Sequence, residues 1–129
     1  MAIDSNKFVI NKGMNNEFII TIKQNNSTLP MVIEGTDTFI AKLYNLETKE
    51  LVLVVTGDAT DNGQVTVHDA ANGQILIVLN NTAANELVSE RGDKIDRYYL
   101  KPTYRLAIDC DTLNNGNFVA KIAEVYVEE

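Results

Sequence analysis

The feature that most constrains the fold is a long stretch, residues 98–127, that reads as two strands joined by a turn. Its first half alternates apolar with polar residues, and a period of two places the apolar ones on one face of a half-buried strand: Tyr104, Leu106, Ile108 and Cys110. Asn115-Gly116 follows, and this dipeptide between alternating apolar runs is a strong hairpin signal because both residues tolerate positive φ. We therefore predict a C-terminal hairpin with strands over residues 98–110 and 117–127.

Shorter runs rich in β-branched residues predict further strands upstream of this hairpin. These runs are residues 17–23, 36–46, 50–55, 64–68 and 74–79. A short edge strand is expected at 31–33, directly after Pro30. The run at 50–55 is almost continuously apolar, which indicates a strand that is covered on both faces or buried at an interface.

One short helix is expected at residues 83–90, with Asn81 and Thr82 as its cap and Leu87 and Val88 as its anchors. The total is seven to nine strands without any strand–helix–strand alternation, so the pattern favours an antiparallel β-sandwich. A chain of 129 residues suits one domain. We divide it into an N-terminal arm or edge strand at 1–14 and a sandwich at 15–129.

The charge balance excludes several classes of partner. The net charge is −7, from 18 acidic against 11 basic residues. Nucleic acid and anionic membrane surfaces are both recognised mainly by lysine and arginine, so neither is expected as a partner. The sequence shows no signal peptide and no apolar run of transmembrane length. We expect synthesis in a reducing cytoplasm.

The residues that carry chemistry are few, and we predict a non-enzymatic protein without cofactor or metal. The single cysteine, Cys110, is expected to be a buried apolar side chain rather than a nucleophile. Asp109 and Asp111 share a strand face that we expect to be solvated, and His68 has no triad motif near it. The loop 58–63 carries aspartate and asparagine but lacks the ligand spacing of an EF-hand.

Six apolar or aromatic side chains are the candidate partner-binding residues. They are Phe8, Val9, Ile10, Tyr98, Tyr99 and Tyr126. The first three form a short apolar run, which is typical of either an edge strand or a docking arm. Tyrosine is favoured at interfaces, where it buries a large area with little loss of entropy. The competing interpretation places some tyrosines in the core with their hydroxyl groups at its rim.

The second half of the chain resembles a known family. The order is Asn81-Thr-Ala-Ala-Asn-Glu-Leu87, a polar connector, Tyr98-Tyr-Leu, Leu106-Ala-Ile-Asp109, and a final strand led by Gly116. This order is similar to the small immunoglobulin-like domains of tailed-bacteriophage virions, and most similar to the N-terminal domain of phage upper baseplate proteins. The resemblance implies an immunoglobulin-like sandwich with a structural role in a virion, and it implies no catalytic residues.

The function expected from the resemblance is that of a decoration or adaptor subunit, assembled into the virion in the host bacterial cytoplasm. Its partners would be other virion structural proteins, with homo-oligomers in a symmetric assembly. The alternative is a carbohydrate- or ligand-binding module that uses Tyr98, Tyr99 or Tyr126 for stacking. The absence of tryptophan, usually the best stacking ring, speaks against this alternative. A small β-fold enzyme is least supported, since the chain has one histidine, one cysteine and no catalytic motif.

Overall fold

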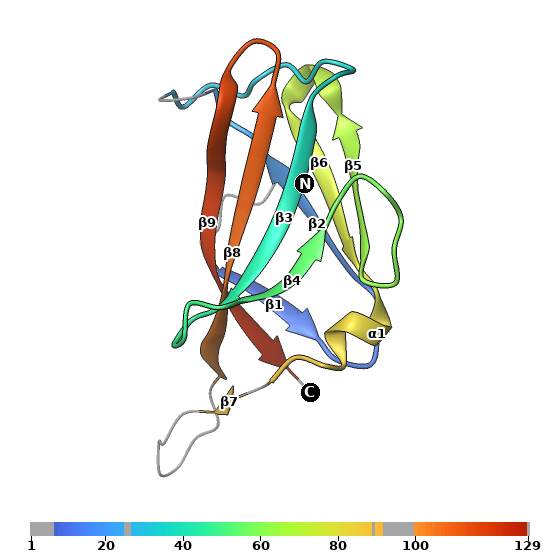
Figure 1. Ribbon diagram of the computed structural model, residues 1–129, viewed down its shortest axis with the longest axis vertical. Helices are drawn as coiled ribbons and strands as arrows, with labels where there is room; N and C mark the ends of the chain where they lie inside the picture. Colours follow the sequence, from blue (N-terminus) through green and yellow to red (C-terminus); the bar gives the residue numbers. More distant parts are fainter. Residues whose placement is uncertain (1–6, 25–26, 89, 92–99, 129) are drawn as a thin grey trace.

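The computed structural model describes residues 7–24, 27–88, 90–91 and 100–128, and it shows a sandwich of two β-sheets (Figure 1). Sheet A has the strand order β1-β9-β8-β3-β4, with β7 paired to β8, and sheet B has the order β2-β6-β5. The strands are β1 (Lys7–Asn11), β2 (Asn16–Thr21), β3 (Thr38–Asn45), β4 (Leu51–Val55), β5 (Gly63–Asp69), β6 (Gln74–Leu79), β7 (Glu90–Arg91), β8 (Leu100–Thr112) and β9 (Gly116–Glu128). Nine strands in the described part confirm the predicted all-β sandwich.

The strand order is that of an immunoglobulin-like sandwich. If β2, β3, β5, β6, β8 and β9 are lettered B to G in chain order, sheet B reads B-E-D and sheet A contains G-F-C, which is the division of strands in such domains. One pairing departs from the antiparallel expectation, because β1 runs parallel to β9, with Phe8 opposite Val125 and Ile10 opposite Val127. The first and last strands of the domain are therefore neighbours at one edge of sheet A.

The C-terminal hairpin forms as predicted, with boundaries shifted by about two residues. Strands β8 and β9 pair from Pro102 opposite Tyr126 to Thr112 opposite Gly116, with two irregularities in the register. The turn covers residues 113–115 rather than Asn115-Gly116, and Gly116 begins β9 at a φ of 71°. The Thr112 side chain closes the turn, since its Oγ1 donates to the Gly116 carbonyl at 2.9 Å and accepts from the Asn115 N–H at 3.1 Å.

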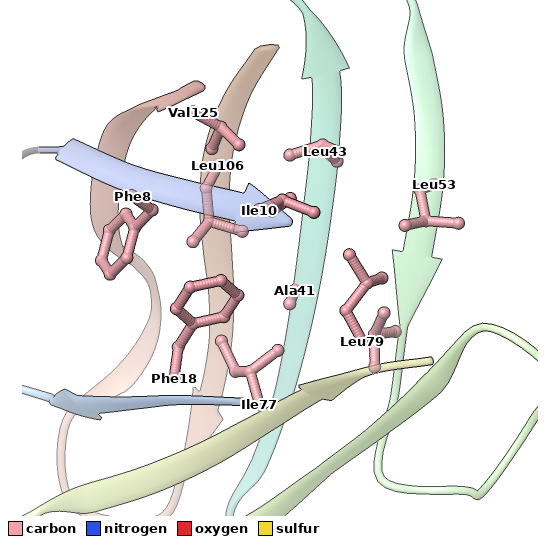
Figure 2. Close-up of a pocket in the computed structure, with 11 residues that line it drawn as sticks. Phe8, Ile10, Phe18, Ala41, Leu43, Leu53, Ile77, Leu79, Leu106 and Val125 are labelled. Atoms are coloured by element: carbon pink, nitrogen blue, oxygen red, sulfur yellow. The ribbon is translucent and has the colours of Figure 1, made fainter. Parts of the chain in front are cut away.

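The core lies between the sheets and is formed by the faces that the alternating patterns predict. On β8 the predicted set is buried: Tyr104, Leu106, Ile108 and Cys110. Ile20, Ile75 and Val127 are fully buried around it, and the rings of Phe8 and Phe18 meet edge to face with centroids 5.5 Å apart. A small apolar cavity of about 30 Å³ remains between the sheets, near these two rings and Leu53 (Figure 2).

The predicted helix at residues 83–90 is wrong in extent. The helix α1 covers only Asn81–Ala84, and its N-cap residue, Asn80, makes no side-chain capping bond. Ala83, Ala84 and Leu87 are buried, but Val88 is 55% exposed and is not an anchor. The helix cannot continue to Val88 because that residue is held by β8 instead.

The tether at Val88 is a corner built around Tyr104. The Val88 N–H donates to Tyr104 Oη at 2.9 Å, and the Val88 carbonyl accepts from Thr103 Oγ1 at 3.0 Å. A buried tyrosine near the start of this strand, bonded to upstream backbone, resembles the tyrosine corner of immunoglobulin-like sandwiches, but here the bonded backbone lies 16 residues upstream rather than a few. The corner fixes the connection between β6 and β8 at the end of the molecule where the C-terminus lies (Figure 1).

Two expectations about local strands are corrected. Residues 31–33 form no strand: Met31 and Ile33 are buried and Val32 is exposed, but their backbone bonds go to Ile22 and Ala70 as single contacts. The run at 50–55 is not covered on both faces, because Leu51 and Val52 are 50% and 46% exposed. An apolar run therefore does not by itself show that both faces of its strand are buried within the domain.

Candidate protein-interaction surface

The six predicted partner-binding residues divide into three groups. Phe8 and Ile10 are 3% and 4% exposed, so the folded β1 strand gives these two side chains to its own core rather than to a partner. Val9 and Tyr126 are half-buried. Tyr98 and Tyr99 lie outside the described residues. The short apolar run at the N-terminus is thus an edge strand of the sandwich, which was one of the two alternatives.

Val9 and Tyr126 lie side by side on the outer face of sheet A. They are paired in the parallel register of β1 and β9, and each stands between two buried residues of its strand, so both side chains point outward. Pro102 of β8 lies opposite Tyr126 on the other side. The Tyr126 hydroxyl donates to Glu124 Oε2 at 3.2 Å. We call Val9, Tyr126 and Pro102 the β1-side patch.

A second apolar cluster lies at the opposite edge of the same sheet. Leu51 and Val52 of β4 are 50% and 46% exposed. Consecutive strand residues normally point to opposite faces, but the register of β3 and β4 shifts here, and this bulge turns both side chains toward solvent. Tyr44 of β3 is half-buried and pairs with Leu51. We call Tyr44, Leu51 and Val52 the β4-side patch.

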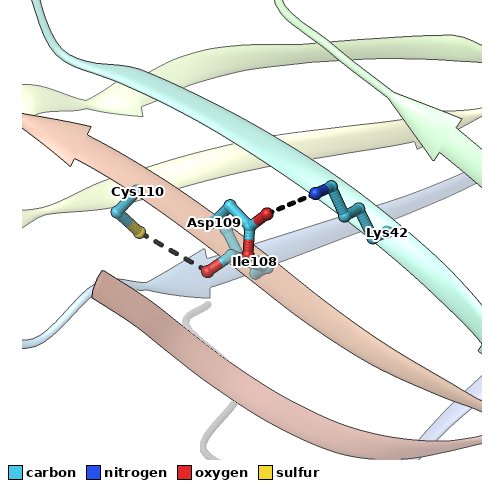
Figure 3. A network of polar contacts seen from close by, with 4 residues as sticks. All are labelled: Lys42, Ile108, Asp109 and Cys110. Atoms are coloured by element: carbon cyan, nitrogen blue, oxygen red, sulfur yellow. Dashed lines mark hydrogen bonds and ion pairs between the residues drawn. The ribbon is translucent and has the colours of Figure 1, made fainter. Parts of the chain in front are cut away.

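An ion pair lies on the outer face between the two patches. Lys42 Nζ of β3 is 2.6 Å from Asp109 Oδ2 of β8, and both side chains are partly exposed (Figure 3). The hydrogen bond that Lys42 donates to Asp109, together with the negative charge of Asp109, raises the pKa of Lys42. Asp109 is therefore paired with a cation across the strands, while Asp111 is exposed near the end of β8.

Cys110 is a core side chain, as predicted. It is 3% exposed, and its Sγ donates to the Ile108 carbonyl at 3.7 Å (Figure 3). Burial raises the pKa of the thiol to about 12, so it stays protonated at neutral pH and is a poor nucleophile. His68 is exposed on β5 of sheet B, whereas Cys110 lies on β8 of sheet A.

In the loop before β5, two threonine hydroxyls accept hydrogen bonds from the loop's own backbone. Thr56 Oγ1 accepts from the Asp58 N–H and Thr60 Oγ1 accepts from the Asn62 N–H, both at 3.2 Å. Asn80 Nδ2 donates to the Thr60 carbonyl. Over the described ranges, no group of three histidine, cysteine, aspartate or glutamate residues is placed to hold a metal ion.

The outer face of sheet A thus carries the two patches, one at each edge. Most other large apolar side chains that are exposed in the described part lie outside this sheet: Met14, Leu29, Val32, Val67, Val88 and Leu113. Sequence reasoning found Val9 and Tyr126, and it named burial at an interface as one possibility for residues 50–55. It missed Tyr44 as the neighbour of Leu51, since that pairing depends on the register of the second hairpin. No helix among the described residues is long and apolar enough to cross a membrane. No protein-family model and no curated protein matches this chain.

Proposed function

We propose that this chain is a non-enzymatic structural protein of a tailed-bacteriophage particle, a decoration or adaptor subunit that binds other particle proteins through the outer face of sheet A. The family is suggested by the sequence resemblance alone. The observation that carries the binding mode is the β4-side patch, in which two consecutive apolar residues of an edge strand are about half exposed.

An exposed apolar edge strand is a liability that natural proteins usually manage with charges or a cover. The strand β4 carries no charged residue within Leu51–Val55, although the chain as a whole is strongly acidic. By contrast, the edge strand β2 carries Glu17 and the edge strand β5 carries His68 and Asp69. A neighbouring subunit that covers β4 would remove its apolar surface from water, and Tyr44 beside it supplies the kind of side chain that dominates interface energies.

The two patches lie at opposite edges of one sheet, and this arrangement suits repeated contacts. A subunit with two different patches can meet one neighbour at the β1-side patch and another at the β4-side patch. Such heterologous contacts close into rings or extend as arrays. The proposed homo-oligomer in a symmetric assembly needs a surface of this kind.

The first test is mass spectrometry of purified particles from the culture that makes this chain, with copy number measured against the major capsid protein. Copy number comparable to the capsid protein would assign the chain to the head lattice, and a much lower number would assign it to a neck, tail or baseplate. Complete absence from the particles would refute the proposal. Binding to a glycan array would then favour the carbohydrate-binding alternative.

The second test asks whether the β4-side patch makes the contact. A tagged Leu51→Gln variant and a tagged Val67→Gln control are each produced in cells that assemble the particles. Leu51 and Val67 are 50% and 49% exposed, but Val67 lies on β5 of the other sheet. We expect incorporation of Leu51→Gln to fall about tenfold, as for loss of one interface residue worth about 1.4 kcal/mol. Equal incorporation of both variants would refute this surface.

A further inference from the structure

The chain contains three Asn-Gly dipeptides, at 62–63, 72–73 and 115–116. Asn-Gly is chemically labile because glycine has no Cβ to keep its backbone nitrogen away from the preceding side-chain amide. We propose that Asn115 is a site of spontaneous deamidation in the folded protein, and that the fold protects Asn62 and Asn72. The selectivity follows from how each dipeptide is held.

Asn72 is fixed by two hydrogen bonds. Its Nδ2 donates to Asp69 Oδ2 at 2.8 Å, and the N–H of Gly73, the nucleophile of the reaction, donates to the Ala70 carbonyl at 3.3 Å. Gly73 is also buried, and a Cβ built on it would lie 2.4 Å from the Met31 carbonyl oxygen. There is no room for the backbone rotation that brings the nitrogen to the side-chain carbon.

Asn62 is fixed in the same manner. Its Nδ2 donates to the Val54 carbonyl at 3.3 Å, and the Gly63 N–H donates to the Thr60 carbonyl at 3.2 Å. Gly63 is buried, and a Cβ on it would lie 1.8 Å from the Val78 carbonyl oxygen. Both the leaving amide and the attacking nitrogen are therefore engaged elsewhere.

Asn115 lacks two of these restraints, the side-chain hydrogen bond and the close packing of its glycine. Within the described structure its side-chain amide makes no hydrogen bond, and only its backbone N–H is bonded, to Thr112 Oγ1. Gly116 is exposed, and a Cβ on it would meet nothing within 4 Å. Gly116 pairs with Thr112 at the turn end of the hairpin, so the motion that the reaction needs opens only that pair.

The reaction needs only water as a co-reactant. The backbone nitrogen of Gly116 loses its proton and attacks Cγ of Asn115, the new N–Cγ bond closes a five-membered succinimide, and the Cγ–Nδ2 bond breaks to release ammonia. Water then opens the ring at either carbonyl. One product has aspartate at position 115, and the other has an isoaspartyl linkage that lengthens the backbone of the turn. Either product adds one negative charge.

The test is to incubate the folded full-length chain at mildly alkaline pH and to measure deamidation at all three sites by peptide mass spectrometry. We expect Asn115 to react at least about tenfold faster than Asn62 and Asn72, the ratio that one net hydrogen bond provides. The same chain in denaturant is the control, and there the three rates should become comparable. Hydroxylamine, which cleaves succinimides, should cut the folded chain only between Asn115 and Gly116.

The variant Asn115→Gln should abolish the fast phase, because glutamine would have to close a larger ring. The inference fails if Asn62 or Asn72 reacts as fast as Asn115 in the folded chain, or if hydroxylamine cuts all three sites without denaturant. It also fails if Asn115 is as slow as the other two. The denaturant control gives the rate of the unfolded chain. Equal rates at that level would mark a loss of folding, and equal rates below it would refute the inference.

Discussion

Replacing Tyr104 with phenylalanine tests whether the corner at Val88 stabilises the sandwich. The substitution removes one oxygen atom and leaves the ring in the core, where Tyr104 is 4% exposed. It therefore leaves the apolar packing intact and deletes the 2.9 Å bond that the Val88 N–H donates. The fold loses the acceptor for that backbone group, which lies at a partly buried position.

The expected cost follows from the fate of the Val88 N–H. A typical intramolecular hydrogen bond contributes about 1 kcal/mol net, and a donor left unsatisfied costs about 1–3 kcal/mol. Val88 is 55% exposed, so water can replace part of the lost bond and the lower figure applies. We expect the free energy of unfolding to fall by about 1–1.5 kcal/mol.

The assay is equilibrium unfolding in urea of the wild type, Tyr104→Phe and Tyr44→Phe. With a slope of about 2 kcal/mol per molar urea, the midpoint of Tyr104→Phe should fall by about 0.5–0.75 M. Tyr44→Phe is the matched control, because Tyr44 is half-buried and its hydroxyl makes no hydrogen bond within the described residues. Its midpoint should stay within about 0.2 M of the wild type. Equal midpoints for the two variants would refute the role of the corner.

Three further predictions concern single positions. Gly73→Ala should lose about 2–4 kcal/mol of stability in thermal unfolding, because φ at this position is +68° and the new Cβ would meet the Met31 backbone. In the control Gly35→Ala the new Cβ meets nothing within 4 Å, so its stability should change by less than about 0.5 kcal/mol. Cys110 should resist iodoacetamide in the folded chain at pH values well below its pKa of about 12 and react fully in denaturant; fast labelling of the folded chain would contradict its burial. Because the pKa of Lys42 is raised in the folded protein, its ion pair with Asp109 stabilises the fold fully below the ordinary lysine pKa of 10.5. This stabilisation is lost as the pH rises through the pKa that Lys42 has in the folded protein. The free energy of unfolding of Lys42→Met, measured against pH, should therefore change less than that of the wild type in this alkaline range.

The sequence predicts the sandwich well because strand alternation depends on local residues. The buried faces of β2, β3 and β8 follow directly from period-two patterns, as Ile20, Ala41 and Ile108 show. Sheet edges are harder to predict, since an apolar run looks the same in a central strand as in an edge strand. For β4 the apolar run left two alternatives, a strand covered on both faces or one buried at an interface, and its place at the edge depends on which strands lie next to β3.

The candidate surface could be predicted only in part for the same reason. Val9 and Tyr126 are separated by most of the chain, and they become neighbours because β1 pairs in parallel with β9. No local pattern specifies that pairing. Phe8 and Ile10 were assigned to a partner because a short apolar run before a turn has the same composition in a docking arm and in an edge strand. Their burial against Val125 and Val127 comes from the tertiary arrangement.

The three Asn-Gly dipeptides show how one local signal leads to three structures. Each glycine has a positive φ, at 144° for Gly63, 68° for Gly73 and 71° for Gly116, as the dipeptide predicts. The asparagine of each pair has no positive φ, so none of the three forms the turn with positive φ at both residues that the dipeptide predicts. Only the tertiary surroundings differ: Gly63 and Gly73 are pressed against backbone carbonyls of other strands or loops, and Gly116 is open. The same pair of residues is therefore closely packed at two positions and lies in an exposed turn at the third. Its rate of deamidation should depend on this packing rather than on the sequence.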